Sequence, residues 1–261
     1  MDYRRHRPSA ELDGLVEHYW SIVSPAPPGP LRAVLVPSGR ATIQFCLGRP
    51  GRRYESGRPA RTNADVYLPV STEPIVIEQE GPSHYVGIQF TPWGARALFP
   101  DAPAHPEQVE TAVGPLPDPA ALATDPTPEL DRWLGTHLPG TLPTGVDLLK
   151  AAVDVVDADP SAGEVADLAD RLHAAPSTLY RAFRRGVGLS PKQYVQIMRY
   201  RAFTDALIAE AGGAPTALLA GLAGYADQAH AARDFSRFTG MTASRFRDTH
   251  DGIAALMART D

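Results

Sequence analysis

The sequence contains a single cysteine, Cys46, among its 261 residues. An intrachain disulfide and a metal cluster held by several cysteines are therefore excluded. The sequence also has no run of 18 apolar residues, and no apolar segment follows its basic start. We therefore expect neither a membrane span nor a secretory signal. Together these absences predict a cytoplasmic protein that does not use a membrane as a partner.

Sequence signatures of common enzyme classes are missing as well. The eight histidines form no H-x-H or H-x-x-x-H pair, and no G-x-S-x-G motif is present. We therefore predict no enzymatic activity, no catalytic residues, no cofactor and no metal. His18 and His84 are interpreted as ordinary core or surface histidines. Cys46 stands between Phe45 and Leu47, a setting that predicts burial rather than reactivity.

Proline is unevenly distributed along the chain. Of the 26 prolines, 22 precede position 146 and only four follow it. Because proline is poorly tolerated inside helices, this change predicts a mainly helical second half. We expect a β-rich sensing or dimerisation domain over 1–100, a proline-rich connector with a short helix over 101–145, a helical domain over 146–250 and a tail over 251–261.

The first hundred residues contain short runs rich in β-branched and aromatic residues, bounded by glycine, proline and serine. The runs are Leu31–Val36, Ala41–Leu47, Val66–Val70, Ile75–Glu80 and Tyr85–Phe90. They predict a small β-barrel or sandwich, with a hairpin turn at 37–39 and flanking helices over 11–20 and 93–99. The connector helix, 129–137, has an apolar side that we expect to pack against a neighbouring domain. The predicted fold class is α+β with two domains.

Charge is also unevenly distributed. The whole chain has a net charge of −5, yet residues 171–247 contain eleven basic and four acidic side chains, a local charge of +7. Because phosphate neutralisation depends on local charge, the acidic pI of about 5.9 excludes no nucleic-acid partner.

The helical half contains two similar units of a short helix, a tight turn and a second helix. In the first unit, Pro176 begins a helix that directs Leu179 and Phe183 inward. In the second, Asp227 is a good N-cap for a helix ending near Phe238. A single helix over 191–209 separates the units, and its length of about 28 Å suits two successive major grooves about 34 Å apart. The outer faces are polar and basic, which favours binding to DNA.

These motifs resemble the paired helix-turn-helix domain of AraC/XylS-type transcription regulators. The resemblance covers about 100 residues and rests on LADRL at 168–172, PSTLYRAF at 176–183, GVGLSPKQY at 186–194, RYRAF at 199–203, GYADQAH at 224–230 and FTGMT at 238–242. His173 replaces a usual turn glycine and Ala175 a usual N-cap serine. Ala231 and Ala243 replace an aromatic residue and a proline.

The resemblance implies which side chains contact DNA. Base-facing residues would be Ser177, Tyr180, Arg181, Gln228, His230 and Arg233. Phosphate-facing residues would be Arg184, Arg185, Lys192 and Arg237. The N-terminal half more weakly resembles the β-rich domains of such regulators, through VEHYW at 16–20, VPSG at 36–39 and FTPWG at 90–94. Its aromatic residues are candidates for an effector pocket: Tyr19, Trp20, Tyr67, Tyr85 and Trp93.

The predicted function is a sequence-specific DNA-binding transcription regulator that reads double-stranded DNA. A small-molecule effector, RNA polymerase and a second copy of the chain are its further candidate partners. Two alternatives remain open: a ligand-binding or interaction protein with a degenerate DNA-binding module, and an enzyme that uses the module for DNA targeting. A DNA-repair methyltransferase of the second kind needs more cysteines than this sequence has.

Overall fold

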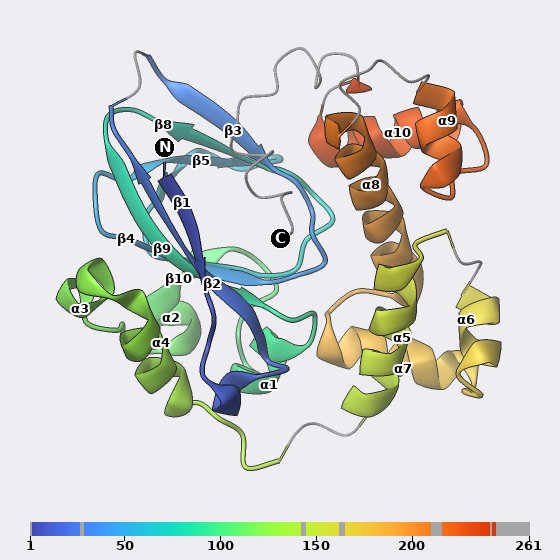
Figure 1. Ribbon diagram of the computed structural model, residues 1–261, viewed down its shortest axis with the longest axis horizontal. Helices are drawn as coiled ribbons and strands as arrows, with labels where there is room; N and C mark the ends of the chain where they lie inside the picture. The colour runs from blue at the N-terminus through green and yellow to red at the C-terminus, as the bar shows by residue number, and fades with distance from the viewer. Residues whose placement is uncertain are drawn as a thin grey trace.

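The computed structural model describes residues 2–26, 29–141, 145–161, 165–209, 216–240 and 242–243. These residues form a β-rich lobe and a helical lobe that lie side by side (Figure 1). The predicted α+β fold with two domains is confirmed, and the β-rich domain is a sandwich. The tail expected over 251–261 lies outside the described residues.

The β-rich lobe is made of two antiparallel sheets. The first has the order β1 (Asp2–His6), β2 (Val16–Ser24), β9 (Ser83–Phe90), β4 (Thr42–Cys46), β7 (Val66–Leu68) and β10 (Glu107–Gln108). The second has the order β3 (Leu31–Leu35), β8 (Ile75–Gln79), β5 (Gly51–Glu55) and β6 (Arg61–Asn63). The five predicted strands are all present.

The prediction of a helix over 11–20 is wrong. Only Ala10–Leu12 form a short 3₁₀ turn, and β2 follows it as a central strand paired with both β1 and β9. Tyr19 and Trp20 point to opposite sides of this strand, and both are buried. Pairing on both edges therefore determines the conformation of this segment.

The hairpin expected at 37–39 is also wrong. Strand β3 pairs with β8, whereas β4 pairs with β7 and β9 of the other sheet. The loop from 36 to 41 therefore crosses from one sheet to the other.

Four helices connect the sandwich to the second lobe: α1 (Gly94–Leu98), α2 (Val109–Val113), α3 (Pro119–Thr124) and α4 (Pro126–Gly135). Helix α1 confirms the helix predicted over 93–99. Helix α4 packs its apolar side on the sandwich, as predicted, with the Trp133 ring centroid 5.7 Å from that of Phe45. Tyr19 also donates a 2.7 Å hydrogen bond to Asp131.

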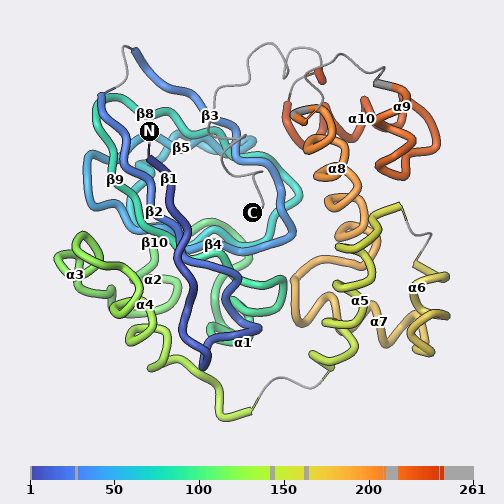
Figure 2. The backbone as a smooth tube through the Cα atoms, viewed as in Figure 1, coloured from blue at the N-terminus to red at the C-terminus, as the bar shows by residue number. Residues whose placement is uncertain are grey.

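The helical lobe contains α5 (Val146–Ala158), α6 (Val165–Arg171), α7 (Pro176–Gly186), α8 (Pro191–Ala209), α9 (Thr216–Leu222) and α10 (Gln228–Thr239). The backbone path places α6 and α7 at one end of α8, and α9 and α10 at the other (Figure 2). In the described part of the chain, no helix is both long and apolar enough to cross a membrane.

Candidate nucleic-acid interface and ligand cavity

The first helix-turn-helix unit consists of α6 and α7. His173 occupies the turn between them with a φ of 48°, a left-handed conformation that usually requires glycine. Ala175 takes the N-cap position of α7 and makes no side-chain capping bond. Leu179 and Phe183 are fully buried beneath α7 and fix its orientation. These contacts leave the opposite side of α7 facing solvent.

The exposed side of α7 carries the predicted contacts Ser177, Tyr180, Arg181, Arg184 and Arg185. Arg184 donates a 3.0 Å hydrogen bond to the Tyr180 hydroxyl, and its guanidinium lies 5.3 Å from the centre of that ring. None of the three arginines forms an ion pair with a described residue. No acidic side chain among the described residues therefore neutralises their positive charge.

The second unit consists of α9 and α10. Asp227 caps α10 by accepting a hydrogen bond from the His230 backbone nitrogen, as the sequence predicted. Phe235 and Phe238 are buried, whereas Gln228, Arg233 and Arg237 are exposed. His230 is only half-exposed because its ring packs edge-on against Tyr225, 5.2 Å away.

Helix α8 joins the two units through separate aromatic contacts with each of them. Tyr194 packs on Phe183 of the first unit with ring centroids 5.5 Å apart. Tyr200 packs on Phe235 and Phe238 of the second unit at 5.7 and 4.9 Å. The predicted phosphate contact Lys192 is exposed near the start of α8. Helix α8 therefore fixes the spacing of α7 and α10.

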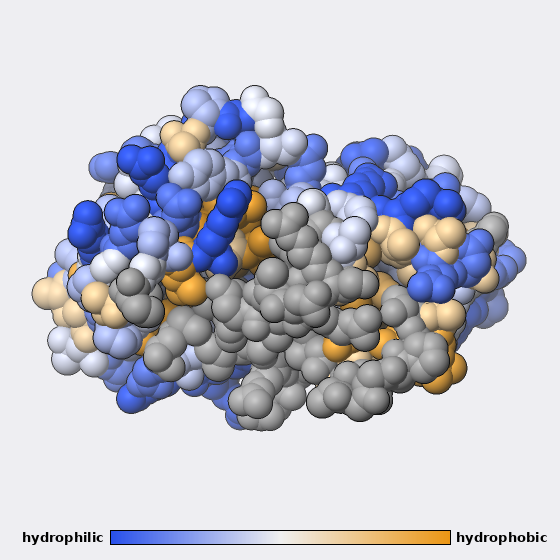
Figure 3. All heavy atoms as spheres, turned by 90° about the horizontal axis from the view of Figure 1, so that it is seen from above, coloured by the Kyte–Doolittle hydropathy of each residue, from blue (hydrophilic) through white to orange (hydrophobic). Residues whose placement is uncertain are grey.

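A partly open cavity of about 550 Å³ lies between the two sheets of the sandwich, and Arg201, Thr204 and Asp205 of α8 also line it. The wall is mainly apolar, with Ile22, Leu31, Val34 and Ile77 among its residues. Seen from above, apolar side chains of the β-rich lobe are visible between hydrophilic ones (Figure 3). A cavity of this size and lining is typical of sites for small organic molecules.

The structure separates the five aromatic residues predicted for an effector pocket. Trp20 and Tyr85 line the 550 Å³ cavity, whereas Tyr67 lines a neighbouring cavity. Tyr19 and Trp93 line neither of these two cavities, and both are buried.

The polar groups of the 550 Å³ cavity differ in their bonding. The Tyr85 hydroxyl donates to the Asn63 carbonyl at 3.0 Å, and burial raises its pKa to about 12. The buried Trp20 Nε1 has no hydrogen-bond partner among the described residues. Burial, aided by the charge of Arg5, lowers the pKa of His18 to about 4, so this histidine is neutral at pH 7. Burying the Trp20 N–H group without a partner costs free energy, and a ligand that accepts a hydrogen bond from it would remove that cost.

Arg40 connects this cavity to the helical lobe. Its guanidinium lies in the cavity wall, donates to Glu17 of β2 at 2.8 Å and pairs with Asp157 of α5. It also donates to the Tyr194 hydroxyl of α8 at 2.8 Å. Burial alone would lower the pKa of Arg40, but its anionic neighbours and Tyr194 raise it, so the side chain is charged.

The loop that carries Arg40 lies directly against α8. A Cβ atom on Gly39 would be 2.8 Å from the Tyr194 ring, and Gly39 also has a φ of +72°, so a side chain is excluded there. Arg201 of α8 donates to the Ser38 carbonyl at 3.4 Å. The sequence alone did not reveal the ion pair between Arg40 and Asp157, because these residues are 117 positions apart and no local motif links them.

The thiol of Cys46 and the candidate metal ligands of the chain bear on thiol and metal chemistry. Cys46 donates from its thiol to the Gly48 carbonyl, and burial raises its pKa. Among the described residues, no group of three or more His, Cys, Asp or Glu side chains is arranged to hold a metal ion.

Two family models match separate parts of the chain. Residues 168–249 match the family described as "Helix-turn-helix domain". Residues 4–107 match a domain of unknown function, DUF6597. The regulatory protein ada of Salmonella typhimurium is 33% identical over 97 residues, which are 37% of this chain and 27% of that protein. The chain thus spans about a quarter of the length of this relative.

Solved structures extend the similarity to both lobes. ToxT from Vibrio cholerae O395 superposes with a TM-score of 0.52 and 9% identity, covering 90% of this chain and 99% of ToxT. The same protein bound to (E)-4-(8-methylnaphthalen-1-yl)but-3-enoic acid superposes with a TM-score of 0.51 and 8% identity, covering 95% of this chain and 99% of that one. At this identity the similarity concerns the fold alone.

The C-terminal lobe is thereby a helix-turn-helix domain with two units. This match agrees with the resemblance of residues 168–249 to the paired helix-turn-helix domain of AraC-type regulators, and the β-rich domain precedes it in a ToxT-like fold.

Proposed function

We propose that this protein is a sequence-specific regulator whose helices α7 and α10 enter successive major grooves of one DNA duplex. The observation that supports this most is the attachment of both units to one continuous helix, α8. Bases would be contacted by Ser177, Tyr180, Arg181, Gln228, His230 and Arg233. Phosphates would be contacted by Arg184, Arg185, Lys192 and Arg237, which supply most of the affinity.

Fluorescence anisotropy against promoter DNA from upstream of the gene and against a random duplex, across a salt series, tests this proposal. We expect tight promoter binding and much weaker random binding, both falling as salt rises. Sites selected from random DNA replace the promoter if the protein regulates genes elsewhere. Equal affinity for selected and random sites would instead favour a degenerate module.

We further propose that a small, mainly apolar effector in the 550 Å³ cavity controls DNA binding. The apolar lining and the unpaired Trp20 Nε1 support a molecule with an apolar body and a hydrogen-bond acceptor. The acid bound to ToxT has both features. Because Arg40 lies in the cavity wall and holds α5 and α8, an effector that displaces it would alter how the helical lobe docks.

A thermal-shift screen of metabolites tests the effector role. We expect at least one compound to raise the melting temperature, and Trp20→Phe to reduce that shift. Failure of every compound would leave the sandwich with a dimerising role. A second copy of the chain and RNA polymerase remain proposed partners.

A further inference from the structure

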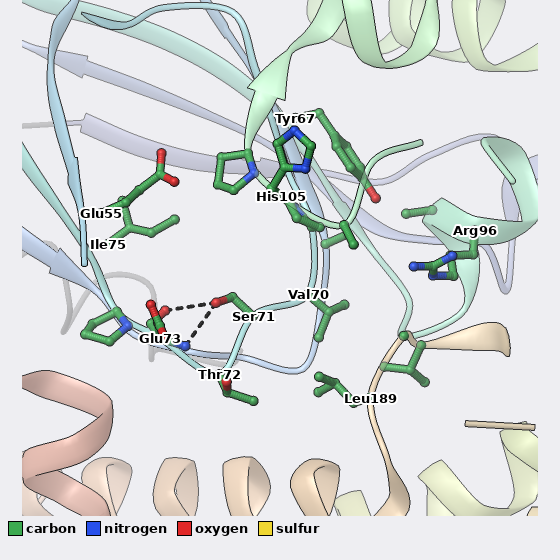
Figure 4. Close-up of a pocket in the computed structure, with 18 of the residues that line it drawn as sticks. Glu55, Tyr67, Val70, Ser71, Thr72, Glu73, Ile75, Arg96, His105 and Leu189 are labelled. Atoms are coloured by element: carbon green, nitrogen blue, oxygen red, sulfur yellow. Dashed lines mark hydrogen bonds between the residues drawn. The ribbon is translucent and has the colours of Figure 1, made fainter. Parts of the chain in front are cut away.

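A second cavity, of about 320 Å³, lies between the sandwich and the helical lobe. Its walls include the connection from β7 to β8, helix α1 and the loop 187–189 that joins α7 to α8. The side chains that matter here are Tyr67, Val70, Glu73, Arg96 and Leu189 (Figure 4).

Arg96 presents an unneutralised charge to this cavity. Its guanidinium lies against Gly188, where an added Cβ would be 3.1 Å from Nη2. Gly188 has a φ of +89°, so the backbone itself also favours glycine there. Within the described part of the chain, Arg96 forms no ion pair and no side-chain hydrogen bond. By contrast, Arg58 in the wall of the same cavity pairs with Glu55 at 3.2 Å.

Tyr67 offers a second unused donor beside Arg96. The residue is only 3% exposed, and its hydroxyl has no hydrogen-bond partner among the described residues. Burial raises the pKa of Tyr67, and the charge of Arg96 opposes that change. Figure 4 shows both on one side of the cavity, with Glu55 and Glu73 on the other.

We propose that Arg96 and Tyr67 bind the carboxylate of a small organic acid in this cavity. A guanidinium and a phenol together supply the charged and neutral donors that a carboxylate accepts. Val70 and Leu189 provide apolar surface for the body of the acid. Glu73 forms no ion pair with a described residue, so its charge opposes a second negative group and selects a monocarboxylate. The bound acid would contact both lobes, because Gly188 and Leu189 follow α7.

Isothermal titration of the full chain with 3-methylbutanoate tests the site, with the neutral isostere 3-methylbutanamide as the matched ligand. We expect saturable binding of the acid and at least tenfold weaker binding of the amide. Arg96→Gln should weaken acid binding at least tenfold, and Tyr67→Phe should weaken it several-fold. Arg58→Gln removes a cation from the same cavity and should change the Kd less than twofold.

Circular dichroism and melting temperature establish that each variant is folded, and Arg96→Lys, which keeps the charge, should retain part of the affinity. Three results overturn the proposal: no saturable binding of the acid at millimolar concentration, equal binding of the amide, or undiminished acid binding by folded Arg96→Gln. The test measures ligand binding without DNA, so its outcome is distinguishable from failure of the proposed regulatory function.

Discussion

Individual side chains on α7 differ in what they can contribute to DNA recognition. Arg181 is exposed near the start of α7, and among the described residues its guanidinium donates a single hydrogen bond, to Thr178 at 3.3 Å, so it is available to a base edge. Arg185 lies one turn later, at the end that we expect to face the backbone. The two arginines therefore allow base contacts and phosphate contacts to be separated by experiment.

Replacement of Arg181 by alanine is expected to cost about 1–3 kcal/mol on cognate DNA and to relax specificity at one base pair. Arg185→Ala should weaken specific and random DNA alike and reduce the salt slope by about one. Anisotropy titrations on cognate, singly mutated and random duplexes distinguish these outcomes. Equal losses on all duplexes for Arg181→Ala would make it a phosphate contact.

His18 should make stability depend on pH. Its pKa is about 4 in the folded protein and about 6.5 in an unfolded chain. Between these values the unfolded chain binds the proton preferentially, so stability falls as pH falls from 6.5 towards 4, with no contribution above 7. Denaturation at pH 7 and pH 5 should show a smaller loss for His18→Gln than for the natural protein. Identical losses would show that His18 is charged in the fold.

The helices of the C-terminal lobe could be predicted closely, because their signals are local. The bounds of α8 agree with the expected 191–209, and α7 begins at the proline that marked its first turn. The left-handed turn at His173 and the missing cap at Ala175 were also visible as departures from a family pattern. Each of these features depends on residues within one or two turns.

The sandwich could be predicted only in part, because its pairing is not local. The segment that leads into β2 has apolar residues at 12, 15, 16 and 19, a spacing that also fits a helix. Pairing with β1 and β9 makes residues 16–24 a strand instead. Strands β1 and β5 contain adjacent arginines at 4–5 and 52–53, which hides them from a search for apolar runs. The contact between Arg40 and Asp157 has no local signal at all.

Helix α7 has no side-chain cap at its N-terminus, although the backbone conformation there would allow one. Ala175 has φ −62° and ψ 138°, the extended conformation of an N-cap residue. Ala175→Ser should therefore raise the free energy of unfolding by about 1 kcal/mol. Asp227→Ala removes the existing cap of helix α10 and serves as the opposite control. This change should lower the free energy of unfolding by a similar amount. Chemical denaturation measures both, and no gain from serine would show that solvent already satisfies the α7 terminus.

At the scale of the whole molecule, the two lobes are held together by a charged contact rather than by apolar packing alone. Arg40 is 10% exposed, and its partners Glu17 and Asp157 are 30% and 26% exposed. Removing the cation leaves two partly buried carboxylates at the interface. Such a loss destabilises more than the pair itself contributes, because the remaining charges are unpaired.

Arg40→Gln should lower the free energy of unfolding by about 2–3 kcal/mol and increase the radius of gyration as the lobes separate. Arg53→Gln is the matched control, since it breaks a buried pair with Glu55 inside the sandwich without touching the helical lobe. It should destabilise the protein without expanding it. Denaturation and small-angle scattering measure both properties, and an unexpanded Arg40→Gln protein would show that the lobes are held by other contacts.

Helix α8 also has a consequence for the DNA itself. Its 19 residues span about 28 Å, which is less than the roughly 34 Å between successive major grooves. If the separation of α7 and α10 follows this length, the proposed complex would fit a duplex curved towards the protein better than a straight one. Curvature is easiest at TA and CA steps and hardest in A-tracts. The base pairs between the two contacted grooves would then influence affinity through their stiffness, although no side chain reads them.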